Sequence, residues 1–216
     1  MFINIHSHQP EIKKEFVIQN LLKDFNQLLS PGYYSAGLHP WHLESQNWEQ
    51  QLVELKKIST TKNILALGEC GLDKVCKTDF KLQQEVFIAQ ILWANEINKP
   101  LIIHCVQAFS ELGDLLKKYN NKTPVIFHGF NKNSRIAEKM LNDGHYLSFG
   151  KSILQHRNKV IFEQVPLDHI FLETDETNIS IEEIYKEAAA IKNISLETLS
   201  LQIEKNVQLV FNINLQ

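Results

Sequence analysis

Residues 64–69 read Ile-Leu-Ala-Leu-Gly-Glu, and residues 100–104 read Pro-Leu-Ile-Ile-His. Each is a short apolar run that ends in a side chain able to bind a metal ion. Between them, Lys81–Asn98 places apolar residues at helical spacing, namely Leu82, Val86, Ala89 and Trp93. The pattern predicts a strand, a crossover helix and a second strand parallel to the first.

The same alternation continues along the chain. The predicted strands are Phe2–His6, Tyr33–Leu38, Ile64–Glu69, Leu101–His104, Val125–His128, Tyr146–Phe149 and Ile170–Glu173. The predicted helices are Phe16–Leu29, Trp48–Ile58, Lys81–Asn98, Phe109–Tyr119, Ser134–Asn142, Ile181–Ile191 and Leu196–Phe211. Continuous apolar strands of this kind indicate a parallel sheet covered by helices on both faces.

About seven such repeats favour an α/β fold of the TIM-like barrel type over a doubly wound sheet. The sequence has no G-x-G-x-x-G or Walker pattern, which an open nucleotide-binding sheet would usually carry. We expect one barrel domain over residues 1–216. An eighth strand is not evident, so the expected barrel is distorted or has a degenerate last strand.

Composition narrows the class of protein. The chain is 44% hydrophobic and 22% charged, which is ordinary for a globular protein. Its net charge of −3 argues against a protein that coats nucleic acid through a broad basic surface. No apolar run is long enough for a membrane span, no signal peptide is evident, and no obligate protein partner is indicated. Cys70, Cys76 and Cys105 cannot all pair internally, which predicts a cytoplasmic location. Cys70 and Cys105 are expected to be packing residues.

Five predicted strands end in residues that bind metals. These residues are His6 and His8, Glu69, His104, His128 and Asp175. In a β/α barrel the carboxyl ends of the strands meet at one mouth, where active sites form. His145 and His169 precede strands and His156 lies in a helical segment, so we interpret these three as surface or structural residues.

His6 and His8 are two residues apart, so in a strand both rings face the same side. Two capping or surface histidines are the alternative for this stretch alone. Four histidines and two carboxylates exceed the ligands of one catalytic zinc and suit two divalent ions that share a bridging carboxylate.

The ordered motifs resemble those of the TatD family of metal-dependent hydrolases. They are His6-Ser7-His8, Gly37-Leu38-His39-Pro40, Gly68–Asp73, Ile102-Ile103-His104, Phe127–Phe130 and Leu172–Asp175, with a QQEVF helix from Gln83. The resemblance implies a β/α barrel with two divalent ions, magnesium first, with zinc and manganese as alternatives. It also implies a 3'-5' exonuclease that trims DNA ends through a metal-bound hydroxide.

The resemblance also assigns roles to residues. It implies that His6 and His8 bind the first metal, that Glu69 bridges, and that His104 and His128 hold the second metal. Asp175 would bind the first metal and orient or deprotonate the water. Two positions depart from the family pattern. Asn4 replaces the aspartate that the family usually has two residues before the first histidine, and Val106 occupies the position two residues after His104 where the family often has an arginine.

Four further residues are candidates for substrate binding. His39 could touch a phosphate, and Trp41 could stack on a base or simply be a packed indole. Lys132 and Arg135 could neutralise phosphates or belong to a solvated helix start. Asp73 is either a partner of a metal ligand or a turn former.

Three functions follow from these patterns. The leading one is metal-dependent cleavage of phosphodiester bonds at single-stranded DNA ends or in another nucleic acid. The second is hydrolysis of an amide or aminoacyl ester, such as D-aminoacyl-tRNA deacylation, at the same two-metal site. The third is metal binding without turnover.

Overall fold

The structure, a computed structural model, describes residues 1–9, 15–21, 25 and 31–215. The described strands are β1 (Phe2–Ser7), β2 (Glu15–Leu21), β3 (Tyr33–Ala36), β4 (Ile64–Asp73), β5 (Leu101–Val106), β6 (Val125–Phe127), β7 (Tyr146–Phe149) and β8 (Ile170–Leu172). The described α-helices are α1 (Trp48–Ser59), α2 (Phe80–Ile97), α3 (Phe109–Lys118), α4 (Ser134–Asn142), α5 (His156–Gln164), α6 (Ile181–Lys192) and α7 (Leu196–Phe211). Short 3-10 turns cover Pro40–His42, Lys151–Leu154 and Leu167–His169.

The chain forms two compact units. Unit 1 combines residues 1–19 with residues 126–216, and unit 2 comprises residues 20–125. In unit 1, β1 is parallel to β2, β7 is parallel to β6 and β8, and a bridge between Ser7 and Asp175 joins β1 to the segment after β8. In unit 2, β4 is parallel to both β3 and β5. This connectivity is that of the predicted α/β, TIM-like barrel, whereas one domain over residues 1–216 stays a prediction.

The prediction was wrong for the segment Phe16–Leu29. It was expected to be a helix, but Glu15–Leu21 is strand β2, and residues 22–24 and 26–29 lie outside the described part. The apolar run Phe16-Val17-Ile18 is buried and ends in two β-branched residues, which favour a strand. The strand missing from the sequence prediction is therefore the second one rather than a degenerate last one.

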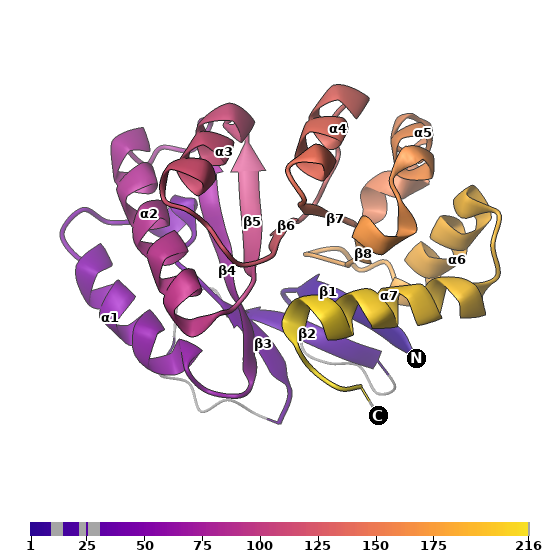
Figure 1. The fold of residues 1–216 in the computed structure, drawn as a ribbon, viewed down its shortest axis with the longest axis horizontal. Helices are drawn as coiled ribbons and strands as arrows, with labels where there is room; N and C mark the ends of the chain where they lie inside the picture. Colours follow the sequence, from indigo (N-terminus) through magenta and orange to yellow (C-terminus); the bar gives the residue numbers. More distant parts are fainter. Residues whose placement is uncertain (10–14, 22–24, 26–30, 216) are drawn as a thin grey trace. The chain divides into compact units, whose positions relative to one another are not determined.

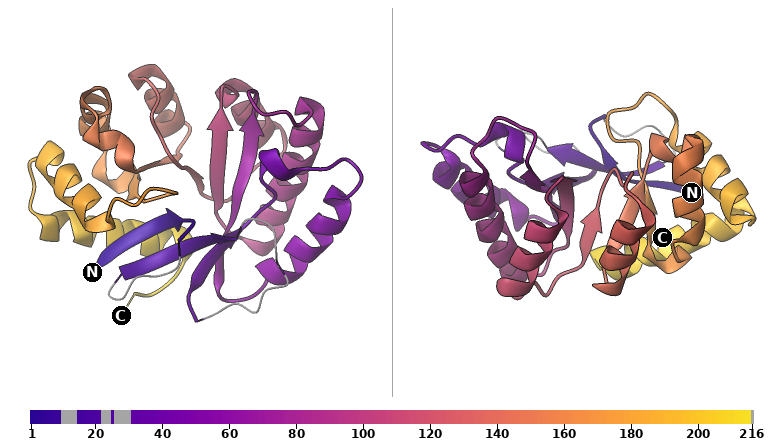
Figure 2. Two further views of the ribbon diagram at one scale, coloured as in Figure 1. Left: turned by 180° about the vertical axis from the view of Figure 1, so that it is seen from behind. Right: turned by 90° about the horizontal axis from the view of Figure 1, so that it is seen from above.

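Helices cover the strands within each unit. In unit 2, α1 and α2 pack on β4 and α3 packs on β5 (Figures 1 and 2). In unit 1, α7 runs beside β1 and β8, and α4 packs on β7 (Figure 1). Among the described residues, no helix combines the length and the apolar character needed to cross a membrane.

A buried tyrosine fixes the start of β1. The Tyr185 hydroxyl, from α6, accepts a hydrogen bond from Ile3 N and donates one to Ile3 O, both at 3.1 Å. Burial raises the pKa of Tyr185, so this hydroxyl stays protonated. The strand that carries His6, and after which His8 follows, is thus anchored by helix α6 from the C-terminal part of the chain.

Gly71 allows β4 to approach β5 closely. Its φ is +139°, and a Cβ built there would lie 2.1 Å from the carbonyl oxygen of His104. No L side chain fits at that distance without a backbone shift. The glycine therefore lets the end of β4 lie against the residue that carries the His104 imidazole.

We expect Gly71→Ala to lower the free energy of unfolding by at least about 2 kcal/mol, because both overpacking and backbone strain oppose it. Urea unfolding measures the loss. Gly144→Ala is the matched control, since Gly144 also has a positive φ (+79°) but a Cβ there meets nothing within 4 Å. Equal losses in the two variants would contradict the close-approach explanation.

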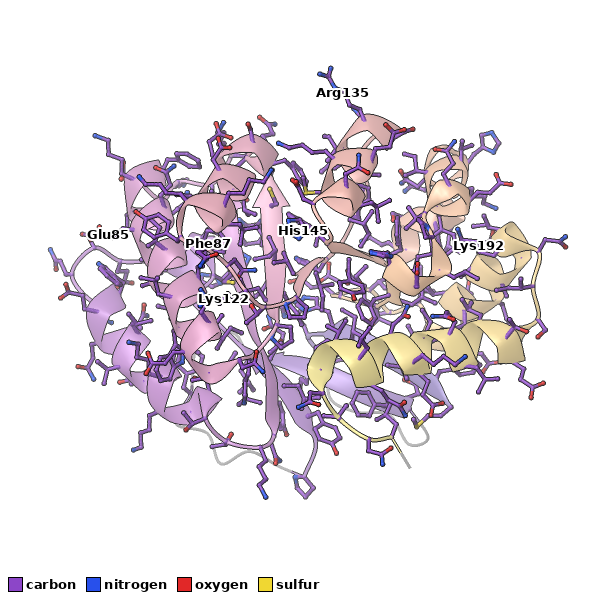
Figure 3. All side chains as sticks on the ribbon, viewed as in Figure 1. Glu85, Phe87, Lys122, Arg135, His145 and Lys192 are labelled. Atoms are coloured by element: carbon purple, nitrogen blue, oxygen red, sulfur yellow. The ribbon has the colours of Figure 1, made fainter. Side chains whose placement is uncertain are left out.

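Lys192 ties the end of α6 to the end of α5 (Figure 3). Its Nζ donates to the carbonyl oxygens of Glu163 and Val165, at 2.8 and 2.5 Å. Burial lowers the pKa of Lys192 to about 8, although the charge of Glu163 opposes the shift. The folded protein therefore releases this proton more readily than the unfolded chain does.

The stability of the protein should depend on pH through Lys192. Between about pH 8 and the ordinary lysine value of 10.5, the unfolded chain binds more protons than the folded one, so stability rises with pH. Below pH 8 both states are protonated and this contribution is constant. We expect the free energy of unfolding of the wild type to rise relative to that of Lys192→Met across this window, as measured by urea unfolding. A constant difference would contradict the lowered pKa.

Candidate active site

Unit 1 brings together three of the predicted metal ligands. His6 lies on β1, His8 follows it, and Asp175 follows β8. Two backbone hydrogen bonds connect the segments, from Asp175 N to His6 O at 3.0 Å and from His8 N to Asp175 O at 3.2 Å. Asp175 Oδ1 lies 3.4 Å from His8 Nε2 and 3.7 Å from His6 Nε2.

These distances fit a divalent cation. Two ligands of one zinc-sized ion, each about 2.0–2.2 Å from it, lie at most about 4.4 Å apart. The 3.4 and 3.7 Å separations are within that limit, and donor atoms of His6, His8 and Asp175 all lie within 4.8 Å of one another. Two imidazoles and one carboxylate suit a divalent transition metal.

Asn4 supports the Asp175 segment from beneath. Its Nδ2 donates to Thr174 Oγ1 at 2.8 Å, and its Oδ1 accepts from Thr174 N at 3.1 Å. Both ends of this buried amide are therefore used on the residue before Asp175. The asparagine at position 4 thus still contacts the residue before Asp175, a predicted metal ligand.

His128 has a buried carboxylate as its neighbour. His128 Nδ1 lies 3.4 Å from Glu173 Oε1, and that oxygen also accepts from Gly129 N at 2.7 Å. Glu173 Oε2 accepts from the Ser148 hydroxyl. Glu173 belongs to the Leu172–Asp175 motif, for which no role of Glu173 was predicted, and the structure makes it the partner of His128.

Unit 2 holds the other predicted carboxylate, Glu69, between two histidines. Its Oε1 lies 2.8 Å from His104 Nδ1 and 3.1 Å from His39 Nε2. Asn20 positions it from β2, since Asn20 Oδ1 accepts from Glu69 N at 3.0 Å. Ligand atoms of Glu69, His104 and His39 lie within 4.8 Å of one another, and Glu69 and His104 are the two of these residues that could hold a divalent cation.

The structure defines which nitrogen of His39 carries a proton. Trp41 N donates to His39 Nδ1 at 3.1 Å, so Nδ1 is the acceptor. Nε2 then carries the proton and donates to Glu69 at 3.1 Å. His39 was predicted to bind substrate, and here its imidazole orients the carboxylate of Glu69.

Both carboxylate oxygens of Asp73 accept hydrogen bonds. Its Oδ2 accepts from Trp41 Nε1 at 2.6 Å and lies 3.1 Å from His104 Nε2, while Oδ1 accepts from Val75 N at 2.7 Å. Burial alone would raise the pKa of Asp73, but the hydrogen bonds from Trp41, Val75 and His104 outweigh it and lower the pKa. Asp73 is therefore ionised at neutral pH.

Helix α2 positions this group with two buried glutamines on one face. Gln83 Oε1 accepts from Asp73 N at 2.7 Å, and Gln83 Nε2 donates to Asp73 O at 2.9 Å. Two turns later, Gln90 makes the same pair of contacts with Leu38 N and O, at 2.8 and 3.2 Å. One helix thus holds both the end of β4 and the residue before His39.

Comparisons with known proteins agree with this geometry. The profile of the family described as TatD related DNase matches residues 10–212. The chain belongs to the TatD family. It is 31% identical over 198 residues to an uncharacterized metal-dependent hydrolase of Buchnera aphidicola subsp. Baizongia pistaciae, covering 83% of this chain and 74% of that one.

Two further TatD proteins are informative. The chain is 28% identical over 172 residues to the 3'-5' ssDNA/RNA exonuclease TatD of Yersinia pseudotuberculosis, covering 76% of this chain and 65% of that one. The crystal structure of YJJV, a TatD homolog from Escherichia coli, matches with a TM-score of 0.83 at 20% identity, covering 99% of this chain and 98% of that chain. This likeness confirms the predicted barrel fold, and the family makes the protein a metal-dependent hydrolase.

Two predicted substrate-binding residues, Lys132 and Arg135, belong to neither of these clusters. Arg135 is exposed and points outward from the start of α4 (Figure 3), and Lys132 lies just before that helix. His145 and His169 lie at the amino-terminal ends of β7 and β8, as predicted. Because Glu69 and His104 belong to unit 2 and the other ligands to unit 1, the bridging role of Glu69 stays a prediction.

The cysteines differ in their surroundings. Cys70 is fully buried, and burial raises the pKa of its thiol, so it is a packing residue as predicted. Cys105 is only half-buried, because the last residues of β5 are more exposed than the first. The degree of burial therefore supports a packing role for Cys70, whereas for Cys105 a packing role stays a prediction.

We expect His8→Ala to weaken Mn²⁺ binding by at least about tenfold, because it removes one of the three donors of the unit 1 cluster. Isothermal titration calorimetry of protein stripped with chelator measures the affinity and the number of ions bound. His169→Ala is the control, since His169 contacts Asp168 and Tyr146 at the other end of the strand. Equal affinities in wild type and His8→Ala would remove His8 from the ligand set.

Proposed function

We propose that this protein is a divalent-metal-dependent 3'-5' exonuclease acting on single-stranded DNA ends. The observation that carries the proposal is the pair of donor clusters, one in each unit, at the carboxyl ends of strands. They consist of His6, His8 and Asp175 in unit 1, and of Glu69 and His104 in unit 2, where His39 is the hydrogen-bond partner of Glu69. We propose two bound ions, magnesium first, with zinc and manganese as alternatives.

Divalent ions, when bound, supply Lewis acidity that activates water and neutralises the charge of a phosphodiester. The residues of the chain have separate tasks around them. Asp175, whose side chain is 40% exposed, can hold the attacking water and accept its proton. Glu69 accepts a hydrogen bond from His39 Nε2 at 3.1 Å and, through its backbone N–H, is tied to Asn20 Oδ1 at 3.0 Å, which keeps the residue in one orientation.

A chain end suits the charge distribution better than a duplex interior does. A net charge of −3 disfavours long-range attraction to a duplex, which carries many phosphates. A flexible single strand needs only local contacts, and the half-exposed indole of Trp41 beside His39 and His104 offers a stacking surface. Lys132 and Arg135 are the proposed phosphate contacts. The name of the Yersinia pseudotuberculosis relative, a 3'-5' ssDNA/RNA exonuclease, supports this substrate.

The test compares linear and circular single strands of equal length, labelled uniformly, with Mg²⁺ and with chelator. We expect stepwise loss of mononucleotides from linear strands and no cleavage of circles. Glu69→Ala should lower the rate at least about 1000-fold, which corresponds to about 4 kcal/mol in barrier height.

Each other result leads to a definite conclusion. Equal cleavage of the circles would replace the exonuclease with an endonuclease. No cleavage of DNA or RNA, together with chelator-sensitive turnover of an amide or aminoacyl ester, would establish the alternative hydrolase. Mn²⁺ binding without turnover of any of these substrates would indicate a metal-binding protein.

We also propose a cytoplasmic location, supported by an odd number of cysteines in a chain that has 3 of them. Fractionation of cells that produce the tagged chain tests this location. Recovery in a membrane or extracellular fraction would contradict it.

A further inference from the structure

Only one of the two carboxylate oxygens of Asp73 takes part in the turn that follows β4. Oδ1 accepts from Val75 N at 2.7 Å and from Cys76 N at 3.2 Å, which is the hydrogen bonding of a turn former. Oδ2 takes no part in that turn. It accepts from Trp41 Nε1 at 2.6 Å and lies 3.1 Å from His104 Nε2.

We propose that Asp73 is a positioning residue that fixes both the metal-binding tautomer of His104 and the orientation of the Trp41 indole. A turn-forming role explains only the contacts of Oδ1. The contacts of Oδ2 connect a predicted metal ligand with a predicted base-stacking residue through one atom. The His104 part needs only a metal-binding site, and the Trp41 part rests on the proposed nuclease function.

The consequence for His104 follows from what a carboxylate can do. An ionised carboxylate only accepts hydrogen bonds, so His104 Nε2 must carry the proton that points at Asp73. The opposite nitrogen, Nδ1, is then left with its lone pair, and it lies 2.8 Å from Glu69 Oε1. Outer partners of this kind orient the imidazole and select the nitrogen that binds the metal.

The consequence for Trp41 is a fixed but accessible ring. The residue is 55% exposed, so packing alone holds it weakly, while its Nε1 hydrogen bond ends on a buried carboxylate. The indole stands edge-on to His104, with ring centroids 5.4 Å apart and an interplanar angle of 78°. It also lines a hollow of about 270 Å³ together with His42, Glu44 and Gln51. An indole held in this way offers a surface to a nucleobase.

The chain itself holds Asp73 rigidly enough for this role. The backbone of Asp73 is clamped by Gln83, which accepts from its N at 2.7 Å and donates to its O at 2.9 Å. The side chain is buried and ends β4. Its position therefore does not depend on Trp41 or His104, and Asp73 can impose an orientation on both.

Asp73→Asn is the variant that separates the two explanations. Asparagine keeps an amide oxygen for the Val75 turn, but places an NH₂ donor against the donors of Trp41 and His104. To accept from that NH₂, His104 must move its proton to Nδ1, the atom that faces Glu69. We expect Mn²⁺ binding to metal-free protein to weaken about 10- to 100-fold, as measured by calorimetry.

Asp79→Asn is the matched control for the change of carboxylate to amide. Asp79 caps α2 by accepting from Leu82 N at 3.0 Å, away from the imidazoles. We expect its Mn²⁺ affinity to stay within about twofold of wild type. Wild-type affinity in Asp73→Asn, in a protein shown to be folded by its thermal transition, would overturn the His104 part.

A second measurement does not depend on any variant. In ¹⁵N spectra of the zinc-loaded wild type, with His104 assigned by its absence in His104→Gln, we expect Nε2 to carry the proton and Nδ1 to be bound to zinc. The reverse assignment would overturn the proposal even if Asp73→Asn failed to fold.

The link to Trp41 is tested by binding of a short single-stranded DNA in chelator, where no turnover occurs. We expect Trp41→Ala to weaken binding about 5- to 100-fold, which is the range for loss of base stacking. Trp41→Phe keeps a ring but loses the bond to Asp73, so its loss should be smaller. Trp93→Phe is the control, because Trp93 Nε1 donates to Ser59 Oγ, in the last residue of α1, at 2.8 Å.

The double variant Asp73→Asn/Trp41→Phe decides whether one carboxylate serves both groups. We expect its loss of DNA affinity to equal that of Trp41→Phe alone, because phenylalanine already lacks the bond to Asp73 and the second change then has nothing more to remove. Additive losses would overturn the Trp41 part. If the wild type cleaves no nucleic acid yet Asp73→Asn weakens Mn²⁺ binding, the nuclease proposal fails and the His104 part stands. If DNA is cleaved and Mn²⁺ binding is unchanged, the reverse holds.

Discussion

The arrangement of the site depends on one constraint, which is that a carboxylate buried at a strand end must have all its oxygens hydrogen-bonded. Glu69, Asp73 and Glu173 are 5%, 3% and 0% exposed. An ionised group at that depth costs several kcal/mol unless it is paired. Here the pairing is made largely with imidazoles, backbone N–H groups and one indole. The need to satisfy the carboxylates therefore orients the histidines around them.

The supporting contacts come from elements that contribute no predicted metal ligand. In unit 2, Gln83 of α2 bonds to the backbone at the end of β4 and Gln90 bonds to the backbone just before His39. In unit 1, Tyr185 of α6 bonds to the backbone near the start of β1. Each of these side chains makes two hydrogen bonds to one backbone residue. Such paired contacts resist rotation as well as translation, which a catalytic site needs if its ligands are to keep their geometry.

The sequence predicted the strand ends well because the physical signal there is local. A run such as Pro-Leu-Ile-Ile-His shows both the buried strand and the polar residue that follows it. At β2 a short apolar run is compatible with a strand or a helix, and the helix predicted there was wrong. Asn20 was missed for that reason, since its contact with Glu69 requires β2 to be a strand. Partners such as Glu173 and Gln83 need the tertiary structure, because side-chain pairing across the chain leaves no periodic trace.

The composition of unit 1 has a consequence for how the protein matures. Asn4 and Thr174 bond to each other although they are 170 residues apart along the chain. At about 5–20 residues per second, a ribosome needs on the order of 10–30 s to make the chain between them. All of unit 2 is made during that interval, before the segment around Thr174 that contacts β1 has been synthesised. The group of His6, His8 and Asp175 therefore comes together only after residue 175 has been made, when all of unit 2 has already been synthesised.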